Sequence, residues 1–324
     1  MKTTEKVAEM LRGESSYISG ESIAEKLNVS RASVWKAIRE LEKNGMTIEA
    51  SPKKGYKLIG EKYVTPDMVL KHLKDPAVRV RTLRTVSSTN TFLKSIADEE
   101  DEGLLVVADS QSAGRGRLGR SFLSPEGTGL YMSLLLKPKM AAQEALSITA
   151  CAAVAVTDIV RKIAPDKNVG IKWVNDIFAD GKKICGILTE AAFNMENGGV
   201  DYVILGIGLN LFEPEGGFGE FSSVAGALFP YSDNTADVKC RAAGMITDRF
   251  MELYASLSEK PFFEDYRRSL FIIGQPITVT KGGDVFFATA LDIDRDFRLL
   301  VRYDNGMEEY LVSGETSIRT RQDG

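Results

Sequence analysis

The segment Gly114-Arg115-Gly116-Arg117-Leu118-Gly119-Arg120 constrains this chain more than any other, because it places three arginines and three glycines in seven positions. Glycine lets a backbone approach a ligand closely, and arginine supplies a charged planar fork that suits carboxylate and phosphate. Arg-Gly clusters are often solvated surface that contacts nucleic acid without specificity. Here strand-like runs flank the segment, at Leu104–Ala108 and Leu130–Leu136. We therefore expect a structured loop that folds over an anion.

The same letters spell G-x-G-x-x-G, the fingerprint of dinucleotide-binding folds, and we reject that interpretation. The fingerprint needs a strand directly before it, a helix directly after it and an acidic residue about 20 positions later. The run Leu104–Ala108 ends too early, and Pro125 and Gly127 break any helix that would follow. No Gly-Lys-Ser/Thr closes the segment, so a Walker-type phosphate loop is excluded as well.

Length and charge indicate a globular protein with several domains. At 324 residues the chain has room for two or three of them. Its net charge of −4 is uneven, since residues 1–60 carry 11 Lys/Arg against 8 Asp/Glu. This asymmetry hints at a basic module attached to an acidic body.

Histidine and cysteine usage limits the chemistry. The single histidine, His72, excludes a histidine-based triad and a histidine metal site, so Arg, Lys, Asp and backbone groups must carry any reaction. The three cysteines lack metal-ligand spacing, and we expect buried thiols in a reducing cytoplasm. The first residues lack the apolar core of a secretion signal. Polar residues interrupt the apolar stretch Leu146–Ile163, which predicts a core helix and not a membrane span.

Residues 1–60 predict a winged helix-turn-helix. Amphipathic segments at Thr4–Arg12 and Ser19–Leu27 precede Ser30, the expected N-cap of a third helix from Arg31 to Lys43. Two strand-like pieces then surround a basic tip, and the third helix and this tip would face DNA. A small protein-interaction module is the alternative. The expected DNA-binding residues are Ser30, Arg31, Ser33, Lys36, Arg39, Lys53 and Lys54.

From Val80 onward strands alternate with helices, as in an α/β or α+β domain. A connector at 60–79 should hold one short helix, Pro66–Leu73, and a single strand should cover Ile171–Ala179 before a tight turn at Asp180-Gly181. Other strands are expected at 183–190 and 202–210, helices near 90–98, 143–164 and 236–257, and four short β pieces after residue 275 that suggest a small β-barrel.

Five motifs, in this order along the chain, resemble those of a known family. They are Ser87-Ser88-Thr89-Asn90, the Gly114–Arg120 loop, Lys172-Trp173-Val174-Asn175-Asp176, Lys183 with Gly186, and Gly206-Ile207-Gly208-Leu209-Asn210. The central region resembles the biotin–protein ligases, and with its winged helix the whole chain resembles the bifunctional biotin ligases that also repress the biotin operon. The resemblance implies a multidomain α+β protein. It would comprise a winged helix-turn-helix domain at 1–62, a linker at 63–79, a class II synthetase-like catalytic domain at 80–268 and an SH3-like β-barrel at 269–324.

The resemblance also implies a reaction. Such ligases join biotin to ATP with Mg²⁺, forming biotinyl-5′-adenylate, and pass the biotinyl group to a lysine of the biotin carboxyl carrier protein of acetyl-CoA carboxylase. The adenylate favours a homodimer that binds a palindromic biotin operator. Such chemistry needs alignment and charge neutralisation and no enzyme nucleophile, which fits a chain without a histidine triad.

Site residues carry over position by position. Lys183 would bridge carboxylate and α-phosphate as the main catalytic group, with Arg115, Arg117 and Asp176, and Asp176 is also the candidate Mg²⁺ ligand. The implied biotin-binding residues are Ser88, Thr89, Asn90, Gln111, Arg115, Gly116, Arg117, Lys183, Gly186, Gly206 and Gly208. The implied ATP-binding residues are Arg117, Arg120, Phe122, Lys172, Asn175, Asp176 and Asn210.

Two departures and three alternatives stay open at this point. Val174 stands where the family often has proline, and Phe122 stands where a tryptophan commonly follows the arginine loop. Phenylalanine keeps a stacking face but lacks the N–H donor. The alternatives are a lipoate-type ligase, a repressor that senses ligand without catalysis, and a ligase whose N-terminal module no longer binds DNA.

Overall fold

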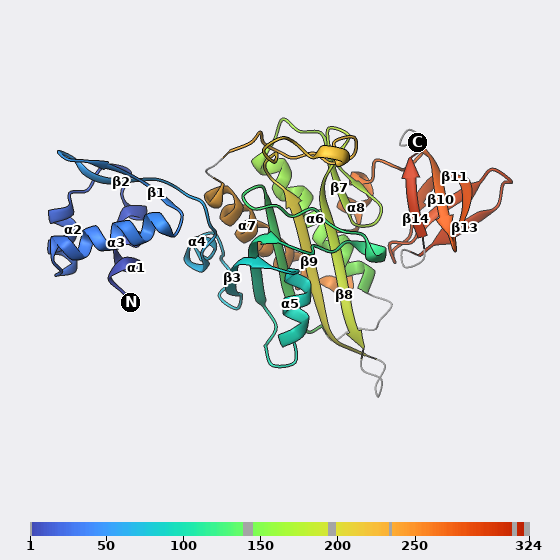
Figure 1. Ribbon diagram of the computed structural model, residues 1–324. Helices are drawn as coiled ribbons and strands as arrows, with labels where there is room; N and C mark the ends of the chain where they lie inside the picture. The colour runs from blue at the N-terminus through green and yellow to red at the C-terminus, as the bar shows by residue number, and fades with distance from the viewer. Residues whose placement is uncertain (1, 139–144, 194–198, 233–234, 313–315, 321–324) are drawn as a thin grey trace.

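The computed structural model describes residues 2–138, 145–193, 199–232, 235–312 and 316–320. Figure 1 shows three units in a row, with a small helical unit at one end, a large sheet with helices in the middle and a small β unit at the other end. No helix in these ranges is long and apolar enough to cross a membrane.

The N-terminal unit is the predicted winged helix. The third helix runs from Arg31 to Lys43 as predicted, because Ser30 caps it by accepting the Ser33 amide at 3.1 Å. Its apolar side, with Val34 and Ile38 almost fully buried, packs on the first two helices. The elements are α1 (Thr3–Gly13), α2 (Gly20–Leu27), α3 (Arg31–Lys43), β1 (Met46–Ser51) and β2 (Gly55–Glu61).

The central unit is built on one mixed seven-stranded sheet. Its strand order is β3-β4-β5-β9-β8-β7-β6, and among these neighbours only β3 and β4 are parallel. The strands are β3 (Arg79–Val86), β4 (Leu104–Gln111), β5 (Gly129–Leu136), β6 (Val169–Lys172), β7 (Asp176–Ala179), β8 (Lys182–Phe193) and β9 (Val200–Asn210).

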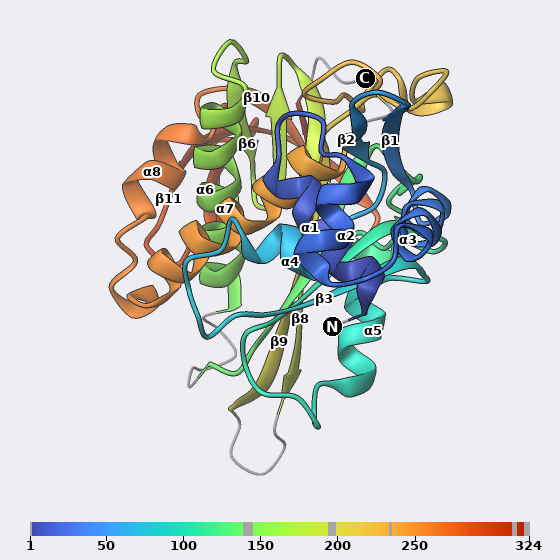
Figure 2. The same cartoon turned by 90° about the vertical axis from the view of Figure 1, so that its left-hand side faces the viewer.

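Helices cover the two faces of this sheet unequally. Helix α5 (Thr89–Ile96) packs on one face, and α6 (Ala145–Ile163) and α7 (Ala236–Tyr254) pack on the other, as Figure 2 shows. Side chains of β4 alternate accordingly, with Val106 in the core under α5 and Val107 in the core under α6 and α7. Helix α6 confirms the predicted core helix, although its expected start at Gln143 lies outside the described residues.

The prediction of one strand over Ile171–Ala179 is wrong. Strand β6 ends at Lys172, residues 173–175 form a turn, and β7 starts at Asp176 and pairs back antiparallel. Two bonds from distant segments hold this turn. The Trp173 indole N–H donates to the Phe297 carbonyl at 2.8 Å, and the Tyr266 hydroxyl donates to the Val174 carbonyl at 2.9 Å.

The remaining elements flank the central sheet. Helix α4 (Pro66–Leu70) is three residues shorter than predicted and contributes Met68 and Val69 to the core under α6 and α7. Helix α8 (Phe263–Ser269) leads to a five-stranded antiparallel sheet, in the region where the sequence predicted four short β pieces and a small β-barrel. Its strands are β10 (Pro276–Lys281), β11 (Asp284–Ile293), β12 (Leu299–Tyr303), β13 (Glu308–Leu311) and β14 (Thr316–Thr320), in the order β13-β12-β11-β10-β14. The fifth strand, at 316–320, was not predicted.

Candidate functional site

A cavity of about 670 Å³ lies on the α5 side of the sheet, beyond the first residues of that helix. It gathers nearly all the site residues that the sequence predicted. Those in its wall are Ser88, Thr89, Asn90, Gln111, Arg115, Gly116, Arg117, Arg120, Phe122, Lys172, Asn175, Asp176, Lys183, Gly186, Gly206 and Gly208. Asn210 lies outside the wall, and its side-chain amide donates to the Gly226 carbonyl at 3.0 Å.

Glycines make the floor of the cavity. On β9, Tyr202 and Ile204 face α5 with side chains, and the next two positions on the same face are Gly206 and Gly208. Opposite Gly208 in β8 stands a third glycine, Gly186. A Cβ atom at Gly208 would lie 2.6 Å from the Phe122 ring, and one at Gly206 would overlap the Asn90 side-chain oxygen. The cavity therefore exists because the sheet carries no side chains there.

One end of the cavity is polar. The Gln111 side chain accepts the Thr89 amide at 2.9 Å and donates to the Ser124 hydroxyl at 2.8 Å. The Ser133 hydroxyl lies 2.6 Å from both the Thr89 hydroxyl and the Asn90 side-chain oxygen. These bonds fix short donors and acceptors at the start of α5, an arrangement that suits a small polar ring.

Sequence reasoning missed two residues that hold this polar end from behind the cavity wall, Ser133 and Glu190. Ser133 is completely buried within an apolar strand, and Glu190 accepts the Asn90 amide at 2.9 Å. The available signal was the period of two, because Ser133 pairs with Gly206 across the sheet and Glu190 follows Gly186 by four positions on β8. That signal required the strand register, which the sequence does not provide.

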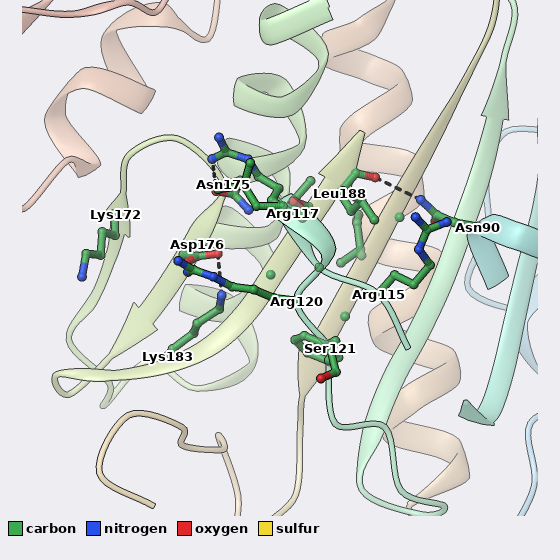
Figure 3. Close-up of a pocket in the computed structure, with 18 of the residues that line it drawn as sticks. Asn90, Arg115, Arg117, Arg120, Ser121, Lys172, Asn175, Asp176, Lys183 and Leu188 are labelled. Atoms are coloured by element: carbon green, nitrogen blue, oxygen red, sulfur yellow. Dashed lines mark hydrogen bonds and ion pairs between the residues drawn. The ribbon is translucent and has the colours of Figure 1, made fainter. Parts of the chain in front are cut away.

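The other end of the cavity is strongly cationic. The Lys183 ammonium lies 2.7 Å from an Asp176 carboxylate oxygen, and Arg117 donates to the Asn175 side-chain oxygen at 2.9 Å. Figure 3 shows Arg120 extending toward Asp176 and Lys183, while Lys172 stands apart on the far side. Burial lowers the pKa of the Arg117 guanidinium, and the nearby Asp176 charge opposes that shift. A guanidinium stays charged at neutral pH, so this end is ready for an anion.

Asn175 anchors the cationic end to the sheet. Its side-chain amide donates to the Ile187 carbonyl at 2.8 Å, and the Ile187 amide donates back to the Asn175 carbonyl at 2.9 Å. The side-chain oxygen that remains is the one that receives Arg117. Arg115 lies nearer the polar end, where its guanidinium is 3.7 Å from Glu190. The arginine loop therefore reaches both ends of the cavity.

We expect Gly206→Ala to weaken binding of the ligand at the polar end by about 1–3 kcal/mol, the usual effect of overpacking. The added methyl group overlaps the Asn90 side-chain oxygen, and Asn90 is held by Ser133, Leu188 and Glu190, so it cannot move freely. Calorimetry with biotin measures the effect. Gly13→Ala is the matched control, because its methyl group lies outside the cavity wall and would meet nothing within 4 Å. Equal biotin affinity in both variants would contradict this account.

Most of the predicted DNA-binding residues are exposed basic side chains, but the two serines are not available in the same way. Arg31, Lys36 and Arg39 are exposed on α3, although Arg39 also pairs with Glu42 at 3.0 Å. Ser30 and Ser33 are instead occupied with each other at the start of the helix, with their hydroxyls 2.8 Å apart. Lys53 and Lys54 are exposed at the tip of the β1–β2 hairpin. Trp35, which sequence reasoning did not select, is 53% exposed on the same helix.

Comparisons with known proteins agree with this geometry. A family model described as the Biotin/lipoate A/B protein ligase family matches residues 82–210, an HTH domain model matches 3–57, and a Biotin protein ligase C terminal domain model matches 272–319. A solved biotin protein ligase from Aquifex aeolicus in complex with biotin and ATP is 25% identical. The similarity covers 74% of this chain and 98% of that one, with a TM-score of 0.58.

Full-length relatives match along nearly the whole sequence. The bifunctional ligase/repressor BirA of Bacillus spizizenii is 34% identical over 309 residues, covering 91% of this chain and 92% of that protein. BirA of Escherichia coli is 27% identical over 330 residues, covering 98% and 97%. This chain belongs to the family of bifunctional ligase/repressors, whose members combine a biotin protein ligase with a helix-turn-helix domain.

Proposed function

We propose that this protein joins biotin to ATP, releases pyrophosphate, and transfers the biotinyl group from the adenylate to a lysine of the biotin carboxyl carrier protein. The observation that carries the proposal is one cavity with two unlike ends, one polar, where Arg115 and Glu190 offset each other's charge, the other lined by Arg117, Arg120 and Lys183. A neutral ring attached to a carboxylate fits across it, with the carboxylate at the cationic end.

The chemistry follows from the positions of the cations. A biotin carboxylate oxygen attacks the α-phosphorus, and the bond from phosphorus to the pyrophosphate oxygen breaks. Lys183 and Arg117 would neutralise the two anions that must meet and the charge that develops between them. The carrier lysine amine then attacks the biotinyl carbonyl carbon, and AMP leaves. Without ligand, the Lys183 ammonium forms an ion pair with Asp176. A ligand phosphate or carboxylate must therefore compete with the Asp176 carboxylate for that ammonium.

We assign the ligand contacts as follows. Biotin would contact Ser88, Thr89, Asn90, Gln111, Arg115, Gly116, Arg117, Lys183, Gly186, Gly206 and Gly208, and ATP would contact Arg117, Arg120, Phe122, Lys172, Asn175 and Asp176. Asn210 would act from behind the wall, through the loop at Gly226. Mg²⁺ suits Asp176, because this ion often takes one carboxylate together with phosphate and water oxygens, and it would supply further neutralisation of the phosphates.

The decisive experiment is pyrophosphate release from ATP with biotin or with lipoate as the acid. Release with biotin, followed by labelling of the carrier protein, supports the proposal. Release with lipoate alone would identify a lipoate-type ligase. No release with either acid, together with measurable biotin binding, would leave a sensor without catalysis.

We further propose that the winged helix represses the biotin operon when biotinyl-5′-adenylate brings two chains together. Exposed Arg31, Lys36 and Arg39 on α3 and the lysines of the wing support this role, because a helix fits the major groove and a basic tip meets phosphate. The domain boundaries would be 1–62, 63–79, 80–268 and 269–324, with 63–79 a connector that packs into the core of the central unit. The natural setting for this reaction and this operator is the cytoplasm.

Arg31→Ala should weaken operator binding by about 1–3 kcal/mol if Arg31 reads a base edge. Lys53→Ala should instead weaken binding to all sequences and lower the salt dependence by about one unit of slope, as expected for a phosphate contact. Operator titrations at several salt concentrations, with and without biotin and ATP, measure both effects.

Lys6→Ala, an exposed change on α1, serves as the control for these titrations. Sedimentation under the same conditions reports the dimer. Equal operator binding with and without biotin and ATP would refute the corepressor role and leave a ligase with a DNA-binding appendage.

A further inference from the structure

Tyr266 lies beneath the cationic end of the cavity. It belongs to α8 and is completely buried, and its hydroxyl donates to the Val174 carbonyl at 2.9 Å. Val174 is also buried and forms the middle of the 173–175 turn between β6 and β7. The hydroxyl therefore supplies a donor to a carbonyl that water does not reach, and such a bond is costly to lose.

The electrostatic surroundings of Tyr266 agree with this role. Burial raises the pKa of its hydroxyl, so the group stays protonated and keeps its proton for Val174. The charge of Arg117 acts in the opposite direction on the pKa of the same hydroxyl. Tyr266 itself is not part of the cavity wall.

The turn links Tyr266 to the arginine loop through bonds already described. Trp173 is tied to the Phe297 carbonyl, Val174 to Tyr266, and Asn175 to Ile187, so each residue of the turn is held by a different segment. The free oxygen of Asn175 then receives Arg117 at 2.9 Å. A shift at Val174 would move the adjacent Asn175 and with it the guanidinium that it positions.

We propose that Tyr266 is a positioning residue for the nucleotide end of the site, acting through Val174 and Asn175 on Arg117. This inference rests on the proposed adenylation. The polar end is held by separate bonds, from the Thr89 amide to Gln111 and from Ser133 to Asn90, neither of which involves the turn. Loss of the Tyr266 hydroxyl should therefore raise the KM for ATP more than the KM for biotin, because most of the proposed biotin contacts do not depend on Arg117.

The test is steady-state adenylation by Tyr266→Phe, which removes one oxygen atom and keeps the buried ring. We expect KM for ATP to rise by about tenfold, as for partial loss of one charge-assisted contact between a displaced Arg117 and the phosphates. The KM and calorimetric affinity for biotin should change less than the KM for ATP. Tyr254→Phe is the matched control, since it removes a hydroxyl that binds Glu102 on the α7 side of the sheet.

A second variant tests the same turn in case Tyr266→Phe folds poorly. Trp173→Phe removes the N–H donor that ties the same turn to Phe297, and it should also raise KM for ATP. A double-mutant cycle then isolates the path, because Tyr266→Phe should add little in an Arg117→Ala background.

Three outcomes would overturn the proposal. They are an unchanged KM for ATP in both single variants, an equal rise in KM for biotin, or fully additive effects with Arg117→Ala. The wild-type protein is assayed in parallel, so that absence of adenylation in the wild type refutes the proposed function and these three outcomes refute the role of Tyr266 alone.

Discussion

Lys183→Ala is expected to lower the rate of adenylate formation by about 10²–10³-fold while the fold stays intact. Lys183 is the ammonium that faces the cavity from β8, and the carboxylate and the α-phosphate must approach each other in its vicinity. A fixed charge aimed at developing negative charge contributes about 2.7–4 kcal/mol in comparable sites. Pyrophosphate release under saturating biotin and ATP measures the loss.

The matched control for this variant is Lys94→Ala, which removes an exposed ammonium from α5 outside the cavity wall. It should leave the rate unchanged. If Lys183→Ala forms the adenylate as fast as the control, Lys183 is not a catalytic residue. Lys183→Arg tests whether the positive charge alone is sufficient. We expect it to recover only part of the wild-type rate of adenylate formation, because a planar guanidinium cannot take the position of a compact ammonium.

Lys239→Met is expected to lower the free energy of unfolding by about 3–5 kcal/mol. Lys239 on α7 and Asp109 on β4 form a buried pair at 2.9 Å, with side chains only 1% and 2% exposed. Removing the ammonium leaves an uncompensated carboxylate inside the protein. Urea unfolding measures the loss, and Lys167→Met, which breaks the more exposed pair with Asp180, should cost no more than about 1 kcal/mol.

The effect of Lys239→Met should also depend on pH. Burial raises the pKa of Asp109, and the Lys239 charge opposes that rise, so the variant loses the opposing contribution. Its folded state then binds a proton that the unfolded state releases, and stability falls as pH rises. The loss relative to wild type should be larger at about pH 8 than at about pH 5. The double change Lys239→Met with Asp109→Leu should recover most of the stability, and a pH-independent loss would refute this explanation.

The winged helix was predictable almost residue by residue because its signals are local. Ser30 caps a helix, an amphipathic pattern follows, and Asn44-Gly45 ends it, all within one stretch of chain. The turn at 173–175 was not predictable for the opposite reason. It contains no glycine or proline, and its partners Tyr266 and Phe297 lie about a hundred residues further along the chain.

The candidate site shows the same division. Residues that bind an anion can be recognised by their type, since arginine, lysine and glycine are the residues such a site requires. Lys183 and the arginine loop could therefore be predicted from the sequence alone, and both line the one cavity. Ser133 and Glu190 depend on strand register, which pairing across the sheet decides. The Lys239–Asp109 pair joins positions 130 residues apart, and no local pattern indicates which lysine will be buried.

The segment that follows the winged helix has a consequence for how the protein can be divided. The Val64 amide donates to Asp109 at 3.2 Å, and Met68 and Val69 are buried in the core of the central unit. A ligase that began at residue 80 would therefore lose part of its own interior, whereas one that began ahead of Val64 would keep it. The winged helix is therefore joined to the ligase through a packed segment and not through a flexible linker. In a dimer, the distance between two operator half-sites would then be set by the way two ligase bodies meet.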